Sequence, residues 1–476
     1  MSFMPDFALA APEIWVAAMI CIVLVADLFV PGKNSATSYY LTLLTLAVAA
    51  WLTIDAQWGA EAMTFSDMYI ADSLGVVLKV AIYGLAALAF VYSRDSLIRN
   101  KLMMGEFFVL GLFAVLGMMV LSSANSLLTI YVGLEMFSLA MYALVAFNRN
   151  SGTSAEAALK YFVLGALSSG ILLYGMSMVY GGTGSLDLGE IAAVAAADGD
   201  NILLLFGLAF LIVGVAFKFG AVPFHMWIPD VYQGAPTPVT LYLGTAPKVA
   251  SVALFMRLIG DGLGAFADQW QTMLIVLVIL SLAVGNIAAL VQTNFKRLLA
   301  YSTVSHVGFI LLGLMAGTEE GYAAGLFYAV TYGITAAGAF AMVMLLQRDG
   351  HEIGDISDLR GLFQRHGWSA LVLLLLMFSM TGIPGTVGFY AKLLVIQAAV
   401  NVGHIWLAAL AIVFSVIGGF YYLKVLKVAF FDKPEGELEM VAPGGYRAVL
   451  AGNGLAVLLL GLFPQALIAV CMAALA

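Results

Sequence analysis

Four charged side chains lie inside stretches of the sequence that are otherwise apolar. Glu135 is followed along the chain by Lys218, Lys248 and Lys392. A charge at the centre of a bilayer costs about 3 kcal/mol, so such a residue usually faces a partner or a wet cavity. Burial disfavours the charged form of a lysine and a nearby carboxylate favours it, so a carboxylate that moves can change a lysine's affinity for a proton. These residues therefore predict a proton relay.

The same four residues also have a purely structural interpretation. Glu135 could be protonated and hydrogen-bonded to a neighbouring helix, and each lysine could sit in a permanent ion pair. One central glutamate cannot neutralise three lysines, however, so we expect at least one lysine to titrate.

Two histidines are weaker candidates for the relay. His306 follows Ser302 by four residues, which places both on one face of a helix, although a packing role for the histidine is equally consistent with this spacing. His225 and Asp230 lie among aromatic residues near the cytoplasmic side.

Three other basic residues lie within or beside apolar stretches. Lys160 and Arg257 are close enough to the ends of their stretches to extend their charged groups to the interface, and we expect both to act as anchors. Lys79 lies deeper, and the sequence leaves open whether it is an anchor or a buried partner.

The composition identifies the solvent in which these residues act. Of 476 residues, 63% are hydrophobic and only 10% are charged, against about 25% charged residues in soluble domains. A water-soluble protein is therefore excluded. Runs such as 371–377 are apolar on all sides, without the alternation of a membrane β-barrel. The chain is predicted to be an all-α polytopic membrane protein.

Apolar runs predict about 14 transmembrane helices. They are 10–30, 38–55, 72–92, 104–121, 125–147, 157–180, 201–234, 240–260, 271–292, 298–316, 321–346, 369–400, 405–431 and 445–470. The seventh and twelfth would measure about 50 Å as straight helices, against about 30 Å of hydrocarbon. Each contains Gly and Pro, at 220–223 and 382–385, so both helices are predicted to be broken.

Broken helices 7 and 12 are five spans apart and cross the membrane in opposite directions, as in an inverted repeat. We expect a three-helix segment at 1–103, a first five-helix repeat (spans 4–8) at 104–260, an inverted second repeat (spans 9–13) at 271–431, and a final helix at 445–476. A pseudo-two-fold axis would then relate Lys218 to Lys392.

Charge predicts the orientation in the membrane. Fourteen of the 20 Lys and Arg residues fall in loops on one side: Lys33, Arg94, Arg99, Lys101, Arg149, Lys296, Arg297, Arg348, Arg360, Arg365, Lys424, Lys427, Lys433 and Arg447. By the positive-inside rule that side is cytoplasmic, which puts both termini outside. The start of the chain lacks the features of a secretory signal, and a bacterial plasma (inner) membrane fits.

The sequence also limits cofactors. Cys21 and Cys471 cannot supply the four ligands of an iron–sulfur cluster or a Cys-x-x-Cys-His haem site, so no cofactor or metal is expected in this chain. Its basic residues are few and dispersed, which argues against nucleic acid as a partner.

Two long motifs resemble the signature of antiporter-like subunits in respiratory complex I and in multisubunit cation/proton antiporters. They are Pro-Phe-His-Met-Trp-Ile-Pro-Asp-Val-Tyr-Gln-Gly-Ala-Pro-Thr-Pro-Val at 223–239 and Lys-Arg-Leu-Leu-Ala-Tyr-Ser-Thr-Val-Ser-His-Val-Gly-Phe at 296–309. Leu-Glu-Met-Phe-Ser-Leu at 134–139, Glu-Ala-Ala-Leu-Lys-Tyr-Phe at 156–162 and Tyr-Gly-Gly-Thr-Gly-Ser at 180–185 look more narrowly like the N-subunit family of bacterial NADH:quinone oxidoreductase.

The resemblance implies roles for the charged residues. Glu135 matches the family's essential glutamate, Lys218 its broken-helix lysine and Lys248 its connecting lysine. Lys392 stands where the related M subunits have glutamate, which favours the N subunits, and no long lateral helix follows, unlike in the L subunits. The implied hypothesis is that Glu135 modulates Lys218. A proton would then pass through Lys248 and hydrated residues including His306, and Lys392 would release it outside.

The resemblance further implies a membrane-arm subunit of complex I that moves protons out of the cytoplasm, driven by electron transfer from NADH to quinone in other subunits. FMN, iron–sulfur clusters, NADH and quinone would be held by those partners. The expected neighbours are other antiporter-like subunits, small membrane subunits and lipid. Two alternatives remain: a subunit of a multisubunit sodium/proton antiporter, and a structural membrane subunit whose charges only pack helices.

Overall fold

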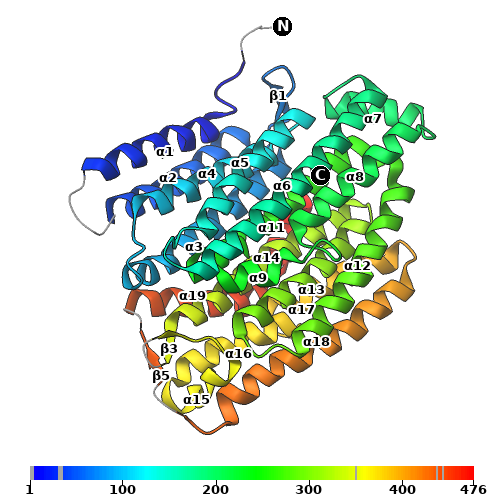
Figure 1. Cartoon of the computed structure of the whole chain (residues 1–476). Helices are drawn as coiled ribbons and strands as arrows, with labels where there is room; N and C mark the ends of the chain where they lie inside the picture. The colour runs from blue at the N-terminus through cyan, green and yellow to red at the C-terminus, as the bar shows by residue number, and fades with distance from the viewer. Residues whose placement is uncertain (1–4, 30–35, 349–350, 436–437, 442–443, 476) are drawn as a thin grey trace.

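The computed structural model describes residues 5–29, 36–348, 351–435, 438–441 and 444–475, and this part of the chain is almost entirely helical (Figure 1). Thirteen helical segments are long and apolar enough to cross a membrane, and two shorter apolar helices in series form a fourteenth span. The spans are α1 (Ala11–Phe29), α2 (Ala36–Gln57), α3 (Ser73–Arg99), α4 (Gly105–Ser122), α5 (Leu127–Val145), α6 (Gly152–Thr183), α8 (Ile202–Phe219), α10 (Thr237–Leu243) with α11 (Ala246–Phe255) and η1 (Met256–Asp261), η2 (Gly264–Phe266) with α12 (Ala267–Leu290), α13 (Phe295–Met315), α14 (Glu319–Leu345), α16 (Gly367–Thr381) with α17 (Val387–Asn401), α18 (Ile405–Phe431) and α19 (Gly444–Leu462). The predicted fold class is confirmed.

Short elements lie at the two ends of the bundle. The hairpin β1 (Ala62–Thr64) and β2 (Tyr69–Ala71) and the helix α7 (Leu188–Ala197) occupy one end in Figure 1. At the other end, β3 (Leu346–Arg348) pairs antiparallel with β4 (His351–Glu352) and β5 (Leu438–Met440), near η3 (Ile356–Leu359) and α15 (Leu362–Arg365). Lys33, which we predicted to lie on the basic side, is outside the described residues.

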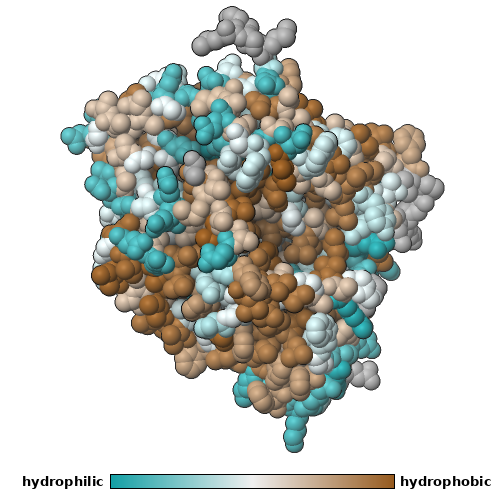
Figure 2. Space-filling model, turned by 180° about the vertical axis from the view of Figure 1, so that it is seen from behind, coloured by the Kyte–Doolittle hydropathy of each residue, from teal (hydrophilic) through white to brown (hydrophobic). Residues whose placement is uncertain are grey.

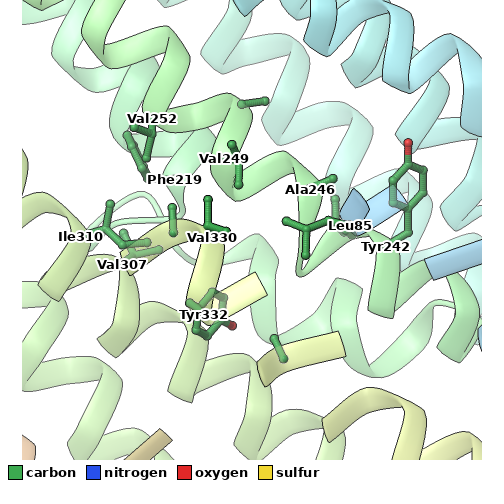
Figure 3. Packing of buried hydrophobic residues seen from close by; sticks show 14 of the residues in the cluster. Leu85, Phe219, Tyr242, Ala246, Val249, Val252, Val307, Ile310, Val330 and Tyr332 are labelled. Atoms are coloured by element: carbon green, nitrogen blue, oxygen red, sulfur yellow. The ribbon is translucent and has the colours of Figure 1, made fainter. Parts of the chain in front are cut away.

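The bundle has a buried centre and an apolar exterior. The spans α13 and α14 and the one from Thr237 to Asp261 are almost completely buried, whereas α1 and α19 expose most of their surface. Side chains of α11, α13 and α14 converge in this centre, including Val252, Ile310 and Val330 (Figure 3). Apolar side chains also cover the middle of the outer face in Figure 2, with hydrophilic ones toward two opposite edges. This is the distribution that a bilayer requires.

Both predicted helix breaks are present, and they have the same backbone geometry. The helix α8 is capped by Gly220 and α16 is capped by Gly382, with φ of +78° and +89°. At each end the glycine N–H bonds the carbonyl three residues back, and the next N–H bonds the carbonyl five residues back. This is the Schellman pattern, which favours glycine because it requires positive φ. The chain then resumes as α9 (Trp227–Gly234) and as α17.

A third break was not predicted. We expected one continuous last helix at 445–470, but α19 ends at Leu462 and α20 (Gln465–Ala473) begins after Pro464. The proline lacks the N–H that would continue the ladder of α19. The break lies beside that of span 12, because a Cβ added at Gly461 would meet the backbone of Thr386 at 2.5 Å.

Candidate functional site

Glu135 and Lys218 lie close together, but they do not form an ion pair. Glu135 of α5 accepts a short hydrogen bond from the Ser169 hydroxyl of α6. Lys218, at the end of α8, donates to Ser138 Oγ at 2.8 Å. Because Ser138 follows Glu135 by three residues, both groups lie on one face of α5. The Glu135 carboxylate and the Lys218 ammonium therefore lie near each other, but each is hydrogen-bonded to a different serine, Ser169 and Ser138.

Lys248 is linked to the same helix end. It is 1% exposed, and its ammonium donates to the Phe219 carbonyl at 2.8 Å. Phe219 is the last residue of α8, so its carbonyl has no partner within the helix. The Trp227 ring lies 5.6 Å from the ammonium. The span is interrupted just before Pro247, since α10 ends at Leu243 and α11 begins at Ala246.

His306 is held through both ring nitrogens. Its Nδ1 is 2.8 Å from the Tyr328 hydroxyl and its Nε2 is 2.9 Å from the Tyr422 hydroxyl, which is in turn bonded to Ser302. A cavity of about 10 Å³ adjoins the histidine. Its lining includes Tyr328, Thr331, Tyr332, Thr335, Ser379, Gly388 and Ala391. This is about the space that one water needs, and the wall supplies several hydroxyl groups as partners.

Lys392 is the last of the four charged residues, and it follows Ala391, which lines that cavity. Its ammonium donates to the Thr381 carbonyl at 2.8 Å and to Ser415 Oγ at 2.9 Å, over the Phe309 ring at 4.9 Å. Thr381 is the last residue of α16, so Lys392 binds the helix end at the second break as Lys248 binds the one at the first. Each break therefore presents a free carbonyl to one lysine.

This correspondence corrects one sequence-based expectation. We predicted that the axis between repeats relates Lys218 to Lys392. Lys218 precedes the break glycine Gly220 by two residues, whereas Lys392 follows Gly382 by ten. When the two glycines are matched, Met380 stands opposite Lys218, and the residue that shares the carbonyl contact of Lys392 is Lys248.

His225 is not joined to this series by any contact among the described residues. It lies in the turn between α8 and α9, and its Nδ1 is buried without a hydrogen-bond partner. Nor do the described residues include a group of three or more His, Cys, Asp and Glu side chains that could hold a metal ion.

The three other basic residues in or beside the apolar stretches, Lys160, Arg257 and Lys79, form ion pairs. Lys160 bonds Asp230 at 2.8 Å and Glu156 at 2.7 Å beside an open pocket of about 280 Å³, and Arg297 bonds Asp230 from the other side. Lys160 is partly exposed, as expected of an anchor.

The anchoring role expected of Arg257 is wrong. Arg257 is only 3% exposed, and its guanidinium is paired inside the protein with Asp72 at 2.7 Å and with Asp261 at 3.3 Å.

Lys79 is a buried partner, the second of the two alternatives that the sequence left open. Its side chain is completely buried and lies 2.5 Å from the Glu13 carboxylate. It also donates to Tyr69 at 2.9 Å and to Gln57 at 3.1 Å. Sequence reasoning missed Glu13 as its partner, although Glu13 is the only charged residue between Asp6 and Asp27.

Comparison with known proteins agrees with this architecture. The family "NADH:quinone oxidoreductase/Mrp antiporter, TM" matches residues 124–418. The chain is 59% identical to NADH-quinone oxidoreductase subunit N of Alkalilimnicola ehrlichii, covering 99% of this chain and 97% of the relative. It is 58% identical to subunit N of Halorhodospira halophila, covering 99% of each.

Solved structures show the same fold. A chain of respiratory complex I from Thermus thermophilus with bound aureothin superimposes with a TM-score of 0.83 at 33% identity, over 96% of this chain and 98% of that one. A chain of the Mrp complex from Dietzia sp. gives a TM-score of 0.84 at 20% identity, over 98% and 97%, which bears on the fold alone. This protein therefore belongs to the family of NADH-quinone oxidoreductase N subunits, within the transmembrane NADH:quinone oxidoreductase/Mrp antiporter family.

Proposed function

We propose that this chain is a membrane-arm subunit of NADH:quinone oxidoreductase and moves protons across the membrane through its central lysines. One observation carries the proposal. Lys218, Lys248 and Lys392 are at most 8% exposed, yet the structure records no carboxylate in salt-bridge contact with any of them among the described residues. A buried lysine without a counter-charge can give up its proton more readily than one in an ion pair.

The contacts support a sequence of transfers. When Glu135 is charged, its field favours a proton on Lys218, and loss of that field releases the proton. The carbonyl that Lys248 binds belongs to the residue after Lys218, so these two lysines flank one helix end. From there His306 and the water-sized cavity beside it lead toward Lys392. In this sequence Lys392 is the residue that releases the proton.

The pocket beside Lys160 and Asp230 is the proposed proton inlet, because it combines open space with charged groups at the end of the bundle that carries Arg297. By the positive-inside rule this end faces the cytoplasm of a bacterial plasma membrane and both termini lie outside. His225, at the turn between α8 and α9, is a secondary candidate for a group that relays protons from this end.

The energy is proposed to come from partner subunits. In this proposal they bind NADH, FMN, iron–sulfur clusters and quinone, while this chain holds no redox centre and no metal. Its neighbours would be other antiporter-like and small membrane subunits, and its units are the segment 1–103, the repeats 104–260 and 271–431, and the C-terminal segment 445–476 with its break at Pro464. Subunit names of relatives and the complex I likeness support this assignment.

The experiment is to replace Lys218 with Met in the complex assembled in its own membrane. Membrane vesicles are then assayed for NADH oxidation with quinone and for protons moved per NADH. We expect fewer protons per NADH, with the complex still assembled. The matched control is Lys427→Met, because Lys427 lies on the exposed surface of α18, with a side chain 72% exposed. Undiminished pumping by Lys218→Met would contradict the proposal.

The same vesicles test the antiporter alternative. Exchange of sodium for protons in the absence of NADH, abolished by Lys218→Met, would assign the lysines to cation/proton exchange. A Lys218→Met variant that only prevents assembly, with normal pumping in whatever assembles, would assign them to helix packing.

A further inference from the structure

The last span belongs to neither five-helix repeat, yet it lies against the break of the second one. We propose that α19 completes the second relay site, with Gly461 acting as a positioning residue for the break that holds Lys392. The proposal rests on the function proposed above, since it gives Lys392 a role in proton transfer. The experiment below distinguishes failure of this proposal from failure of the proposed function.

The contact at Gly461 is between backbones. A Cβ added there would lie 2.5 Å from both Cα and C of Thr386 and 2.6 Å from the Gly385 oxygen. Real Cβ atoms do not approach backbone this closely, so only glycine fits without moving the break. Membrane helices commonly use small residues for such close approaches. Seven residues earlier on α19, Gly454 lies against Val372 of α16, so α19 follows span 12 up to the break.

The break in turn sets the surroundings of Lys392. The ammonium donates to the carbonyl of Thr381, which ends α16. The lysine's aliphatic stem lies against Gly382, where an added Cβ would be 2.9 Å from Lys392 Cδ. The segment from Gly382 to Thr386 is therefore in contact with Lys392 at one end and with Gly461 at the other. Displacing it at Gly461 must change the geometry at Lys392.

The first repeat has a matching arrangement. Its break, after α8, is contacted by the buried Ser281 of α12, whose hydroxyl accepts the Val222 N–H at 2.9 Å. The helix α12 belongs to span 9, the span that directly follows the first repeat, and α19 belongs to span 14, which directly follows the second. Each broken helix is thus contacted by the span that comes after its repeat. The first break is contacted by α12, and the second break, which holds Lys392, is likewise contacted by α19.

The test compares Gly461→Ala with Gly452→Ala in the assembled complex. Both changes add one methyl group to α19, but a Cβ at Gly452 meets no atom within 4 Å. We expect Gly461→Ala to lower the protons moved per NADH about twofold or more, because an overpacked contact displaces its neighbours. Gly452→Ala should pump normally. Adding Gly461→Ala to Lys392→Met should lower pumping no further, because coupled changes at one site are not additive.

Four outcomes decide the proposal. Normal pumping by Gly461→Ala while Lys392→Met is impaired would overturn it and leave the proposed function intact. An additive loss in the double variant would also overturn it, since α19 would then act elsewhere. Normal pumping by Lys392→Met would contradict the relay itself. If Gly461→Ala fails to assemble, Pro464→Ala decides, because it shifts the end of α19 without adding an atom at the contact, and its normal pumping would overturn the proposal.

Discussion

Lys79 and Lys248 are both almost completely buried in the membrane-spanning bundle, but their surroundings differ. The ammonium of Lys79 contacts a carboxylate, an amide oxygen and a hydroxyl, from Glu13, Gln57 and Tyr69. The ammonium of Lys248 has one carbonyl oxygen and an aromatic ring. The first lysine has a counter-charge and three acceptors, which favour its charged form. Among the described residues the second has no such counter-charge, which is what proton exchange requires.

The difference separates two uses of buried charge in one chain. The pairs Glu13–Lys79 and Asp72–Arg257 tie helices together near one end of the bundle, and removing either partner would leave the other uncompensated. Among the described residues, no carboxylate is in salt-bridge contact with the three central lysines, so removing one of them breaks no ion pair. Substitutions should therefore affect assembly in the first group and pumping in the second.

The largest expected effect is on Lys79. Lys79→Met leaves the buried Glu13 carboxylate unpaired, which should cost about 3–5 kcal/mol of stability and strongly reduce the assembled complex. The double variant Glu13→Gln/Lys79→Met should recover much of this loss, because no charge is left unpaired. Thermal unfolding and the yield of purified complex measure both. If the double variant were as unstable as the single one, the ion pair would not be the cause.

Lys248→Met should have the reverse signature. It removes an unpaired buried charge, so assembly should be unchanged, while protons moved per NADH should fall to a small fraction of the normal value. Proton uptake by membrane vesicles at matched NADH oxidation rates measures this. Normal pumping by Lys248→Met would remove Lys248 from the proton path. It would also contradict the distinction between an ion-paired lysine that serves assembly and an unpaired lysine that serves pumping.

A smaller effect is expected at His306. His306→Phe keeps the ring but removes the bonds to Tyr328 and Tyr422, so about 1–3 kcal/mol of stability should be lost with a partial loss of pumping. His306→Gln, which can still bond one hydroxyl, should pump better than the Phe variant. Equal pumping by both variants at the normal level would assign the histidine to packing.

The smallest effect is expected at Tyr69, in the loop hairpin beside Lys79. Burial, together with the charge of Glu13, raises the pKa of the Tyr69 hydroxyl far above its usual range. A folded-state pKa that is raised contributes stability below the unfolded pKa of about 10, and this is lost as pH rises further. Tyr69→Phe should cost about 1 kcal/mol at neutral pH and weaken the loss of stability above pH 10. Parallel unfolding curves for both proteins up to high pH would contradict this.

The sequence was sufficient for the number of spans and for the charged residues that lie among them. Hydropathy identifies apolar length, and glycine next to proline identifies two of the breaks. The break at Pro464 was missed because the predicted span 445–470 is shorter than the two spans that were judged too long, and no charged residue lies close to Pro464. Apolar length alone does not distinguish a tilted helix from a broken one.

Partners between spans could not be predicted. Ser169, Tyr422 and Ser415 contact the site from helices whose rotation about their own axes depends on packing, and hydropathy does not report rotation. The same reason explains the error at Arg257, which lies near a span end but faces Asp72 rather than the interface. The expected pairing of Lys218 with Lys392 relied on the two broken spans crossing in opposite directions, each with a lysine beside its break. The backbone relates the breaks and leaves the lysines on opposite sides of them.

The free carbonyls at the two breaks have an electrical consequence. The end of a helix carries about half a unit of negative charge from its aligned peptide dipoles. Lys248 and Lys392 each bind such an end, at Phe219 and at Thr381. A dipole attracts the ammonium as a carboxylate would, but it cannot accept the proton. A proton that leaves either lysine is therefore not captured by the carbonyl that binds the ammonium, and it must move on to water or to the next basic group.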